Sequence, residues 1–162
     1  MTRQYSHEGV DGMNAEAHIR DAVAGDLDTV IRLDEIHTGL AKPDYWREMF
    51  QAYVTEDHFG RYFLIAELSD EMAGFIVGEI RTWEFGSPPC GWVFAVNVSP
   101  HCREGGIGSG LLDAVCSRFR DCGVSTVRTM VSRNDALNLS FFRSQGMTAG
   151  PYMELEKSLE RD

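Results

Sequence analysis

A glycine-rich segment lies in the second half of the chain, between an apolar run and a helix-like pattern. The apolar run covers residues 92–98, and the segment 103–110 reads Arg-Glu-Gly-Gly-Ile-Gly-Ser-Gly. Glycines at such a junction let backbone N–H groups approach a ligand with no Cβ in the way. A helix N-terminus adds unpaired N–H donors and partial positive charge. The segment therefore predicts a site for a phosphate or pyrophosphate group.

Two common phosphate-binding loops do not fit this segment. A nucleoside-triphosphate loop needs a lysine after its last glycine, and the chain has no lysine near the segment. A dinucleotide fingerprint, G-x-G-x-x-G/A, places Leu111 at its sixth position when it starts at Gly106. That fingerprint also belongs near the start of a βαβ unit, whereas this segment follows three consecutive strand-like runs, 62–68, 73–83 and 92–98. These mismatches exclude an NTPase and argue against a nicotinamide cofactor.

Composition limits the partners of the chain. It has 162 residues, with 15 Lys and Arg against 25 Asp and Glu, a net charge of -10. A nucleic-acid partner is not expected, because it would require a basic face. The acidic balance mildly suggests a cationic amine substrate, although a solvated acidic surface that keeps the protein soluble is the favoured explanation. The four cysteines have no CxxC spacing, so no metal site is expected. No apolar leader or membrane-length run is visible, which favours a cytoplasmic protein that does not engage a membrane.

Hydrophobic periodicity predicts the elements that would position the segment. Strands are expected at 17–23, 62–68, 73–83, 92–98 and 124–131, with a last strand or an extended tail at 148–158. Helices are expected at 27–37, from Pro43 to about residue 53, from the glycine-rich segment to Gly123, and from about residue 134 to 145. Hairpin strands followed by alternating strands and helices predict an α/β fold with a mixed sheet and helices on its faces.

A third loop pattern, R/Q-x-x-G-x-G/A between a strand and a helix, matches Arg103, Gly106 and Gly108. Here the chain resembles the GNAT superfamily of acyl-CoA-dependent N-acyltransferases. Residues 134–147 resemble that family's second signature, N…A…FY…GF, and 73–78 and 152–157 resemble its hairpin and closing strands. The resemblance implies the GNAT fold, with a mostly antiparallel sheet, a splayed strand pair and about four flanking helices. It covers about 17–158 and implies a single domain over 16–162, after a flexible tail at 1–15.

The resemblance also implies the site. The glycine-rich segment would bind the pyrophosphate of acetyl-CoA, and the backbone of the preceding strand would pair with the pantetheine arm. The amide of Val98 would polarise the thioester carbonyl. The CoA-binding residues implied are Val96, Asn97, Val98, Arg103, Glu104, Gly105, Gly106, Ile107, Gly108, Ser109, Gly110, Asn134, Phe141 and Phe142. Asn134 would serve equally well as a helix N-cap, and core packing is the simpler account of at least one of the two phenylalanines.

The chain departs from the family pattern at three places. Glu104 and Gly105 stand where a glycine and a basic residue are usual. Phe142 stands where many members have a tyrosine that protonates the leaving thiolate, and Trp92 stands where some members have a basic glutamate. Glu79, on the neighbouring strand, is therefore the predicted base. The alternatives are Glu84, His101 and His37.

The implied reaction is transfer of an acetyl group from acetyl-CoA to a primary amine, by direct attack on the thioester. The acceptor would be a small-molecule amine or a peptide amine, bound by residues 34–53 and 83–92. Four aromatic side chains could line that pocket: Tyr45, Trp46, Trp83 and Phe85. Two other functions remain open, a catalytically weak CoA-binding or regulatory module and an acetyltransferase of protein N-termini or lysines. Dimers are common in such families, so a homodimer is also open.

Overall fold

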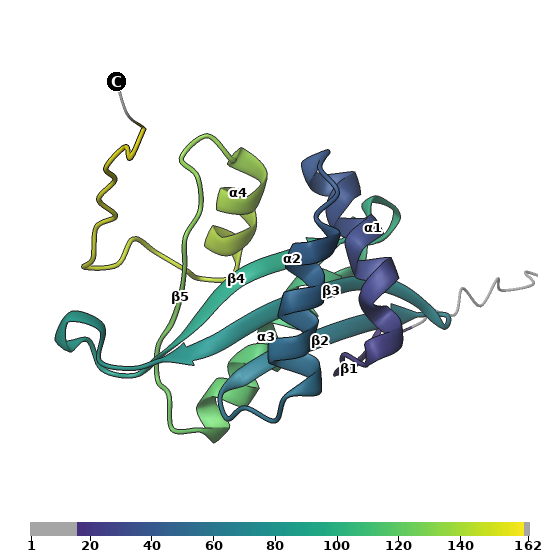
Figure 1. The fold of residues 1–162 in the computed structure, drawn as a ribbon, viewed down its shortest axis with the longest axis horizontal. Helices are drawn as coiled ribbons and strands as arrows, with labels where there is room; N and C mark the ends of the chain where they lie inside the picture. Colours follow the sequence, from purple (N-terminus) through teal and green to yellow (C-terminus); the bar gives the residue numbers. More distant parts are fainter. Residues whose placement is uncertain (1–15, 161–162) are drawn as a thin grey trace, which may run out of the picture. The chain divides into compact units, whose positions relative to one another are not determined.

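The computed structural model describes residues 16–160, so the expected tail at 1–15 lies outside the described residues. The chain divides into two compact units, one ending at Thr129 and the other beginning at Met130. The strands are β1 (His18–Asp21), β2 (Arg61–Leu68), β3 (Glu71–Arg81), β4 (Cys90–Val98) and β5 (Val127–Thr129) (Figure 1). The helices are α1 (Leu27–Thr38), α2 (Pro43–Phe50), α3 (Ile107–Asp121) and α4 (Ala136–Ser144).

The five strands form one open sheet in the order β1-β2-β3-β4-β5. The pairs from β1 to β4 are antiparallel, and β5 runs parallel to β4. The predicted α/β fold with a mixed, mostly antiparallel sheet is thus confirmed. The strand expected at 124–131 shortens to Val127–Thr129, and residues 148–158 form no strand but an exposed extended segment.

Helices α1 and α2 cover one face of the sheet in the first unit. Buried side chains from both helices meet the sheet in one apolar cluster: Val30, Leu33, Trp46, Phe50, Phe63, Ile65, Phe75 and Val77. The ring of Trp46 stands edge-on to Phe75 with centroids 5.3 Å apart, and only 1% of the residue is exposed. Trp46 is therefore a core residue and not a pocket wall.

Helix α3 lies on the opposite face, against glycines of β3 and β4. A Cβ at Gly91 would come within 2.3 Å of the Phe119 ring, and one at Gly78 within 3.0 Å of the same ring. A Cβ at Gly74 would lie 2.6 Å from the carbonyl oxygen of Asn97. The glycines in these strands thus mark close approach, as glycine within a strand often does. They let α3 pack directly on the sheet beside the end of β4.

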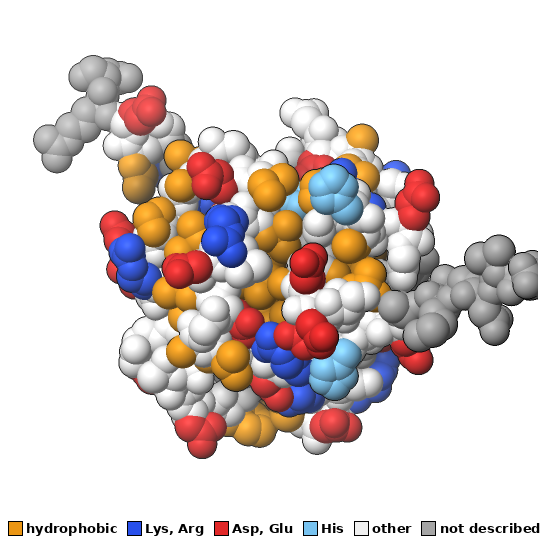
Figure 2. Space-filling view, turned by 90° about the vertical axis from the view of Figure 1, so that its right-hand side faces the viewer, with side chains coloured by type: hydrophobic (Ala, Val, Ile, Leu, Met, Phe, Trp, Pro, Cys, Tyr) orange, Lys and Arg blue, Asp and Glu red, His pale blue; other side chains and the backbone are white. Residues whose placement is uncertain are grey.

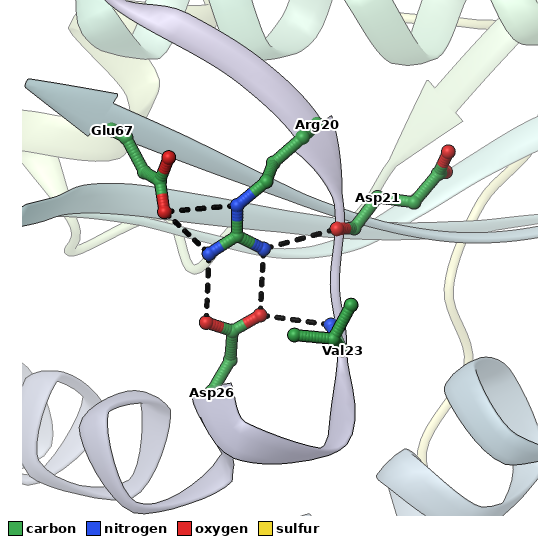
Figure 3. A network of polar contacts seen from close by, with 5 residues as sticks. All are labelled: Arg20, Asp21, Val23, Asp26 and Glu67. Atoms are coloured by element: carbon green, nitrogen blue, oxygen red, sulfur yellow. Dashed lines mark hydrogen bonds and ion pairs between the residues drawn. The ribbon is translucent and has the colours of Figure 1, made fainter. Parts of the chain in front are cut away.

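Arg20 ties the first strand to the start of α1 (Figure 3). Its guanidinium donates to both oxygens of Asp26, at 2.8 and 2.9 Å, and to Glu67 of β2. Asp26 also accepts from the backbone N–H of Val23 at 2.8 Å. Asp26 precedes α1 as expected of an N-cap, yet its side chain turns back to these partners and makes no capping bond to the helix. The hydrogen bond from Arg20 lowers the pKa of the Asp26 carboxyl below its ordinary value.

We expect Arg20→Met to lower the free energy of unfolding by about 1–3 kcal/mol near neutral pH, because the Asp26 carboxylate loses its charged partner. Because the pKa of Asp26 is lower in the folded state than in the unfolded state, where it is near 3.8, the ionised carboxylate stabilises the fold above that pH. This contribution is lost as the pH falls through the pKa of Asp26 in the folded state. The difference between wild type and variant should therefore shrink below about pH 4. Urea unfolding across pH measures it, with Arg32→Met on the exposed face of α1 as the control. A pH-independent difference would contradict the role given to Asp26.

Candidate active site

The strand β4 has one open edge, defined here as the backbone of residues 94–98 on the side away from β3. The pairing of β4 with β5 covers only Gly91, Trp92 and Val93. It ends where the Thr129 hydroxyl donates to the Val93 carbonyl at 2.8 Å. Beyond that point, no strand within residues 16–129 pairs with β4 on this side. The splayed strand pair implied by the resemblance is present.

The register with β3 shows which backbone groups face the open edge. The Ser99 N–H donates to the Ala73 carbonyl at 2.8 Å, so it points toward β3. Because alternate residues of a strand point to opposite edges, Asn97 also faces β3, and Val96 and Val98 face the open edge. Of the three predicted arm-binding residues, two offer N–H and C=O groups there, whereas Asn97 pairs with Phe75.

An irregularity in the ladder lies just before this stretch. Ala95 pairs with Val77 and Val93 pairs with Gly78, so Phe94 is an extra residue in β4. A β-bulge of this kind bends a strand and re-aims its side chains, and it often lies beside an active site. The ring of Phe94 packs edge-on to that of Tyr53, with centroids 5.7 Å apart.

The predicted glycine turn lies between the open edge and α3. A short 3₁₀ helix, Pro100–Gly105, follows β4, and Gly106 then takes the left-handed conformation with φ 71°. Ile107 and Gly108 begin α3, where N–H groups of the first turn have no acceptor within the helix. A glycine turn followed by these donors suits the phosphates of a CoA ligand.

The two charged residues of the turn differ in their contacts. The Arg103 guanidinium lies 3.1 Å from Nε2 of His37, whose Nδ1 lies 2.9 Å from the Leu33 carbonyl. A His37 tautomer with its proton on Nδ1 satisfies both contacts, because Nε2 then accepts from Arg103. Glu104 is exposed, so water screens its repulsion of an anion.

Glu79 lies on the α1–α2 side of the sheet with both carboxylate oxygens engaged. The Tyr53 hydroxyl donates to Oε2 at 2.6 Å, and Nε of Arg81 donates to Oε1 at 3.0 Å. The Glu79 side chain is 22% exposed, so solvent or a substrate can reach it. Each oxygen keeps a second lone pair that can accept a further hydrogen bond.

A π-helical turn, Gln51–Thr55, carries Tyr53 to this carboxylate. Such turns are rare and frequently mark functional sites. Burial, followed by the hydrogen bond to Glu79, raises the pKa of the Tyr53 phenol well above its usual value. Tyr53 therefore stays protonated and donates to Glu79. The sequence placed Tyr53 only on an apolar helical face and did not single out Arg81, although an acid and a base two residues apart on a strand share one face.

The alternative bases are less well placed. Glu84 lies in the exposed turn between β3 and β4, and His101 is exposed in the 3₁₀ helix after β4. Both ring nitrogens of His37 are engaged. In the predicted pocket region, Asp34 is buried and accepts from the indole N–H of Trp46 at 2.9 Å.

The second predicted signature lies in the unit that begins at Met130. Asp135, not Asn134, caps α4, because its carboxylate accepts from the Asn138 N–H at 3.0 Å. The N-cap alternative for Asn134 was therefore wrong, and its contact with CoA stays a prediction. Phe141 and Phe142 stack edge-on with centroids 5.0 Å apart, and Phe142 is buried.

Residues 28–147 match the model of the acetyltransferase (GNAT) family. The chain belongs to the GNAT family. A search of curated proteins finds no match to it.

Solved structures share the GNAT fold over most of the chain. AAC(6')-Iy, in complex with the bisubstrate analogue CoA-S-monomethyl-acetylneamine, is 17% identical with a TM-score of 0.76, covering 88% of this chain and 98% of that one. The aminoglycoside 6'-N-acetyltransferase AAC(6')-Ih from Acinetobacter baumannii is 16% identical with a TM-score of 0.75, and the match covers 90% of this chain and 100% of that one. A transcriptional regulator from Bacillus halodurans C-125 is 18% identical with a TM-score of 0.73, covering 89% and 100%. At these identities the likeness shows the fold alone.

Within residues 16–160, no group of three or more His, Cys, Asp or Glu is placed to hold a metal ion. In the same part of the chain, no helix has the length and apolar character needed to cross a bilayer. Acidic and basic side chains are interspersed on the face drawn in Figure 2.

The glycine turn offers a matched pair of substitutions. Gly106→Ala forces a side chain into the left-handed region, at a cost of roughly 1–2 kcal/mol. Gly105→Ala brings its Cβ only to ordinary contact, 3.9 Å from the Ile107 side chain. We expect Gly106→Ala to lower the free energy of unfolding by about that amount and Gly105→Ala to leave it nearly unchanged. Urea unfolding of both variants measures this, and equal losses would show that the turn conformation is not what requires Gly106.

Proposed function

We propose that this protein is an N-acetyltransferase that moves an acetyl group from acetyl-CoA to a primary amine. The observation that carries the proposal is the open edge of β4, which leads directly to the glycine turn and the N-terminus of α3. In a member of the GNAT family, this arrangement supports a CoA site with the arm along the strand and the phosphates at the helix.

The backbone supplies the donors for such a ligand. The N–H groups of Ile107 and Gly108 would hold the pyrophosphate, with the Arg103 guanidinium beside them. The N–H and C=O groups of Val96 and Val98 at the open edge would pair with the pantetheine arm as a strand would. Because these are backbone contacts, the valine side chains need only be compatible with the arm.

The position of Glu79 favours Val96 over Val98 as the amide that polarises the thioester carbonyl. Val98 lies opposite Gly74 and Val96 opposite Ile76, five and three residues along β3 from Glu79. At the rise of a strand, these separations are about 17 and about 10 Å. A base at Glu79 therefore serves a carbonyl at Val96 more readily, through its side chain and a bridging water. Val98 would then bind the pantetheine arm two residues nearer the glycine turn.

The reaction needs no covalent enzyme intermediate. Acetyl-CoA supplies an activated acyl group, and the new C–N bond forms as the C–S bond breaks. The proton lost by the amine passes to Glu79 or its bridging water. Phe142 has no proton to give, so the CoA thiolate takes one from water.

Both AAC(6')-Iy and AAC(6')-Ih are named aminoglycoside acetyltransferases. Those names make aminoglycosides one acceptor class to test, together with simple primary amines and peptide amines. At 16% and 17% identity, the acceptor has to be argued from this chain's own residues.

Acetyl-CoA should bind, and a primary amine should stimulate release of the free thiol. Calorimetry measures binding, and a thiol-reactive dye measures turnover across a panel of amines, including aminoglycosides and a peptide. Arg103→Ala should weaken CoA by several-fold, because a charge-assisted contact to phosphate is lost. Tight CoA binding without turnover on any amine would identify a CoA-binding module instead. No binding of CoA or acetyl-CoA would contradict both functions.

Glu79→Gln should lower kcat by about 100-fold or more, because the amide cannot accept the amine proton. The loss should be smaller at high pH, where more of the amine is already neutral. Acetyl-CoA affinity should not change, since Glu79 lies away from the glycine turn. Glu71→Gln, at the exposed start of β3, is the matched control. An unchanged kcat/KM and pH profile in Glu79→Gln would remove Glu79 from the mechanism.

A further inference from the structure

The guanidinium of Arg81 is held rigidly beside Glu79 while its outer edge stays open. Its Nε donates to Glu79, and its central carbon lies 4.5 Å from the centroid of the Trp92 ring. The side chain is 33% exposed. Among residues 16–160, nothing accepts a hydrogen bond from its terminal nitrogens Nη1 and Nη2. An arginine fixed by a carboxylate and an aromatic ring, with two parallel N–H groups unused, is prepared to bind a planar anion.

A second guanidinium lies in the adjacent strand. Arg61 is directly opposite Glu79 in the β2–β3 ladder, and Glu79 is opposite Trp92 in the β3–β4 ladder. These side chains therefore form one row across the sheet face, with neighbouring Cβ atoms about 5 Å apart. Arg61 also stacks on Tyr53, 5.2 Å from the ring centroid, and donates to the Ala52 carbonyl at 3.2 Å.

The local charge is therefore opposite in sign to that of the whole chain. Two arginines flank one glutamate, whereas the chain as a whole carries -10. Glu56, which follows the π-helical turn, is paired with His58 at 3.5 Å and with Gln51 at 3.4 Å. Arg61, Glu79 and Arg81 together thus carry one positive charge in excess, which repels a polycationic acceptor and attracts an anionic group.

We propose that the acceptor carries a carboxylate as well as its reactive amine, and that Nη1 and Nη2 of Arg81 bind this carboxylate. The inference rests on the proposed acetyl transfer. Because the Arg81 side chain folds back onto Glu79, its terminal nitrogens lie close to Glu79. Glu79 is three residues along β3 from Ile76, which is opposite Val96. That separation, about 10 Å, fits an amine and a carboxylate joined by roughly six bonds with a hydrogen bond at the acid end. The acceptor class is then an ω-amino acid, a lysine α-carboxylate or a short peptide.

Three acceptors of matched length test the carboxylate contact: 6-aminohexanoate, hexylamine and 1,6-diaminohexane. With the wild-type protein, kcat/KM from thiol release should be at least about 10-fold higher for the amino acid than for hexylamine, and lowest for the diamine. Arg81→Gln should abolish this preference. The variant also removes a partner of Glu79, but that effect is common to all acceptors and cancels from the ratio. Triglycine and triglycinamide repeat the comparison for a peptide acceptor.

Two further variants define the contact. Arg81→Lys keeps the charge but not the fork, so it should retain only part of the preference. Arg120→Gln, on the exposed end of α3, should retain all of it. The absence of any preference in the wild type, or its persistence in Arg81→Gln, would overturn the carboxylate site while leaving the acetyl transfer intact.

A binding measurement distinguishes failure of the proposed carboxylate site at Arg81 from failure of the proposed acetyl transfer. If no amine is acetylated, calorimetry of 6-aminohexanoate against the CoA-loaded protein gives the same comparison. Binding that is lost in Arg81→Gln would keep the carboxylate site and contradict the reaction. If 6-aminohexanoate is neither acetylated nor bound, the carboxylate site is overturned.

Discussion

The early end of the β4–β5 pairing determines what the rest of the structure can do. A sheet normally satisfies both edges of an inner strand, and an unpaired edge is available to another chain or to an extended ligand. Here the Thr129 hydroxyl closes the ladder at Val93, and β4 continues for five more residues, Phe94–Val98. The proposed site is thus made of backbone groups that no strand pairs with in residues 16–129, and such a site requires no particular side chains.

The packing of the sheet fixes where this open edge leads. Glycines at 74, 78 and 91 let α3 and β4 approach β3 so closely that a Cβ would clash. Helix α3 is thereby held against the sheet with its N-terminus just beyond the end of β4. The bulge at Phe94 is the first residue of the open edge, and it lies between Val96 and Trp92, which is opposite Glu79. The proposed CoA site and the candidate base Glu79 therefore lie along the same pair of strands, β3 and β4, near opposite ends of it.

Local signals were enough to predict the glycine turn and the elements around it, whereas CoA as its ligand was implied only by the family resemblance. The glycine turn, the element order and the sheet type follow from turn chemistry and hydrophobic periodicity, and these depend on neighbours in the chain. Contacts between distant residues were not predictable in this way. The pairing of Tyr53 with Glu79, and of Arg103 with His37, joins residues 26 and 66 positions apart. Asn and Asp are equally good N-cap residues, so residue type did not distinguish Asn134 from Asp135. The start of α4 at Ala136 makes Asp135 the N-cap.

The net charge of the chain favours a cationic acceptor, whereas the charges around Glu79 favour an acceptor with an anionic group. The local charges should dominate, because they act at short range. Exposed charges separated by more than about 10 Å are largely screened at ordinary ionic strength, so most of the acidic surface contributes little at one point of the sheet. Arg61 lies directly opposite Glu79 and Arg81 donates a hydrogen bond to it, and both arginines are partly shielded from water and stack on aromatic rings. The acidic surface then influences solubility and long-range encounter, while the two guanidiniums determine which group is held beside the base. An acceptor with one amine and one carboxylate fits both, because its amine would reach the thioester near Val96, with Glu79 acting through a bridging water, while its carboxylate meets the free terminal nitrogens of Arg81.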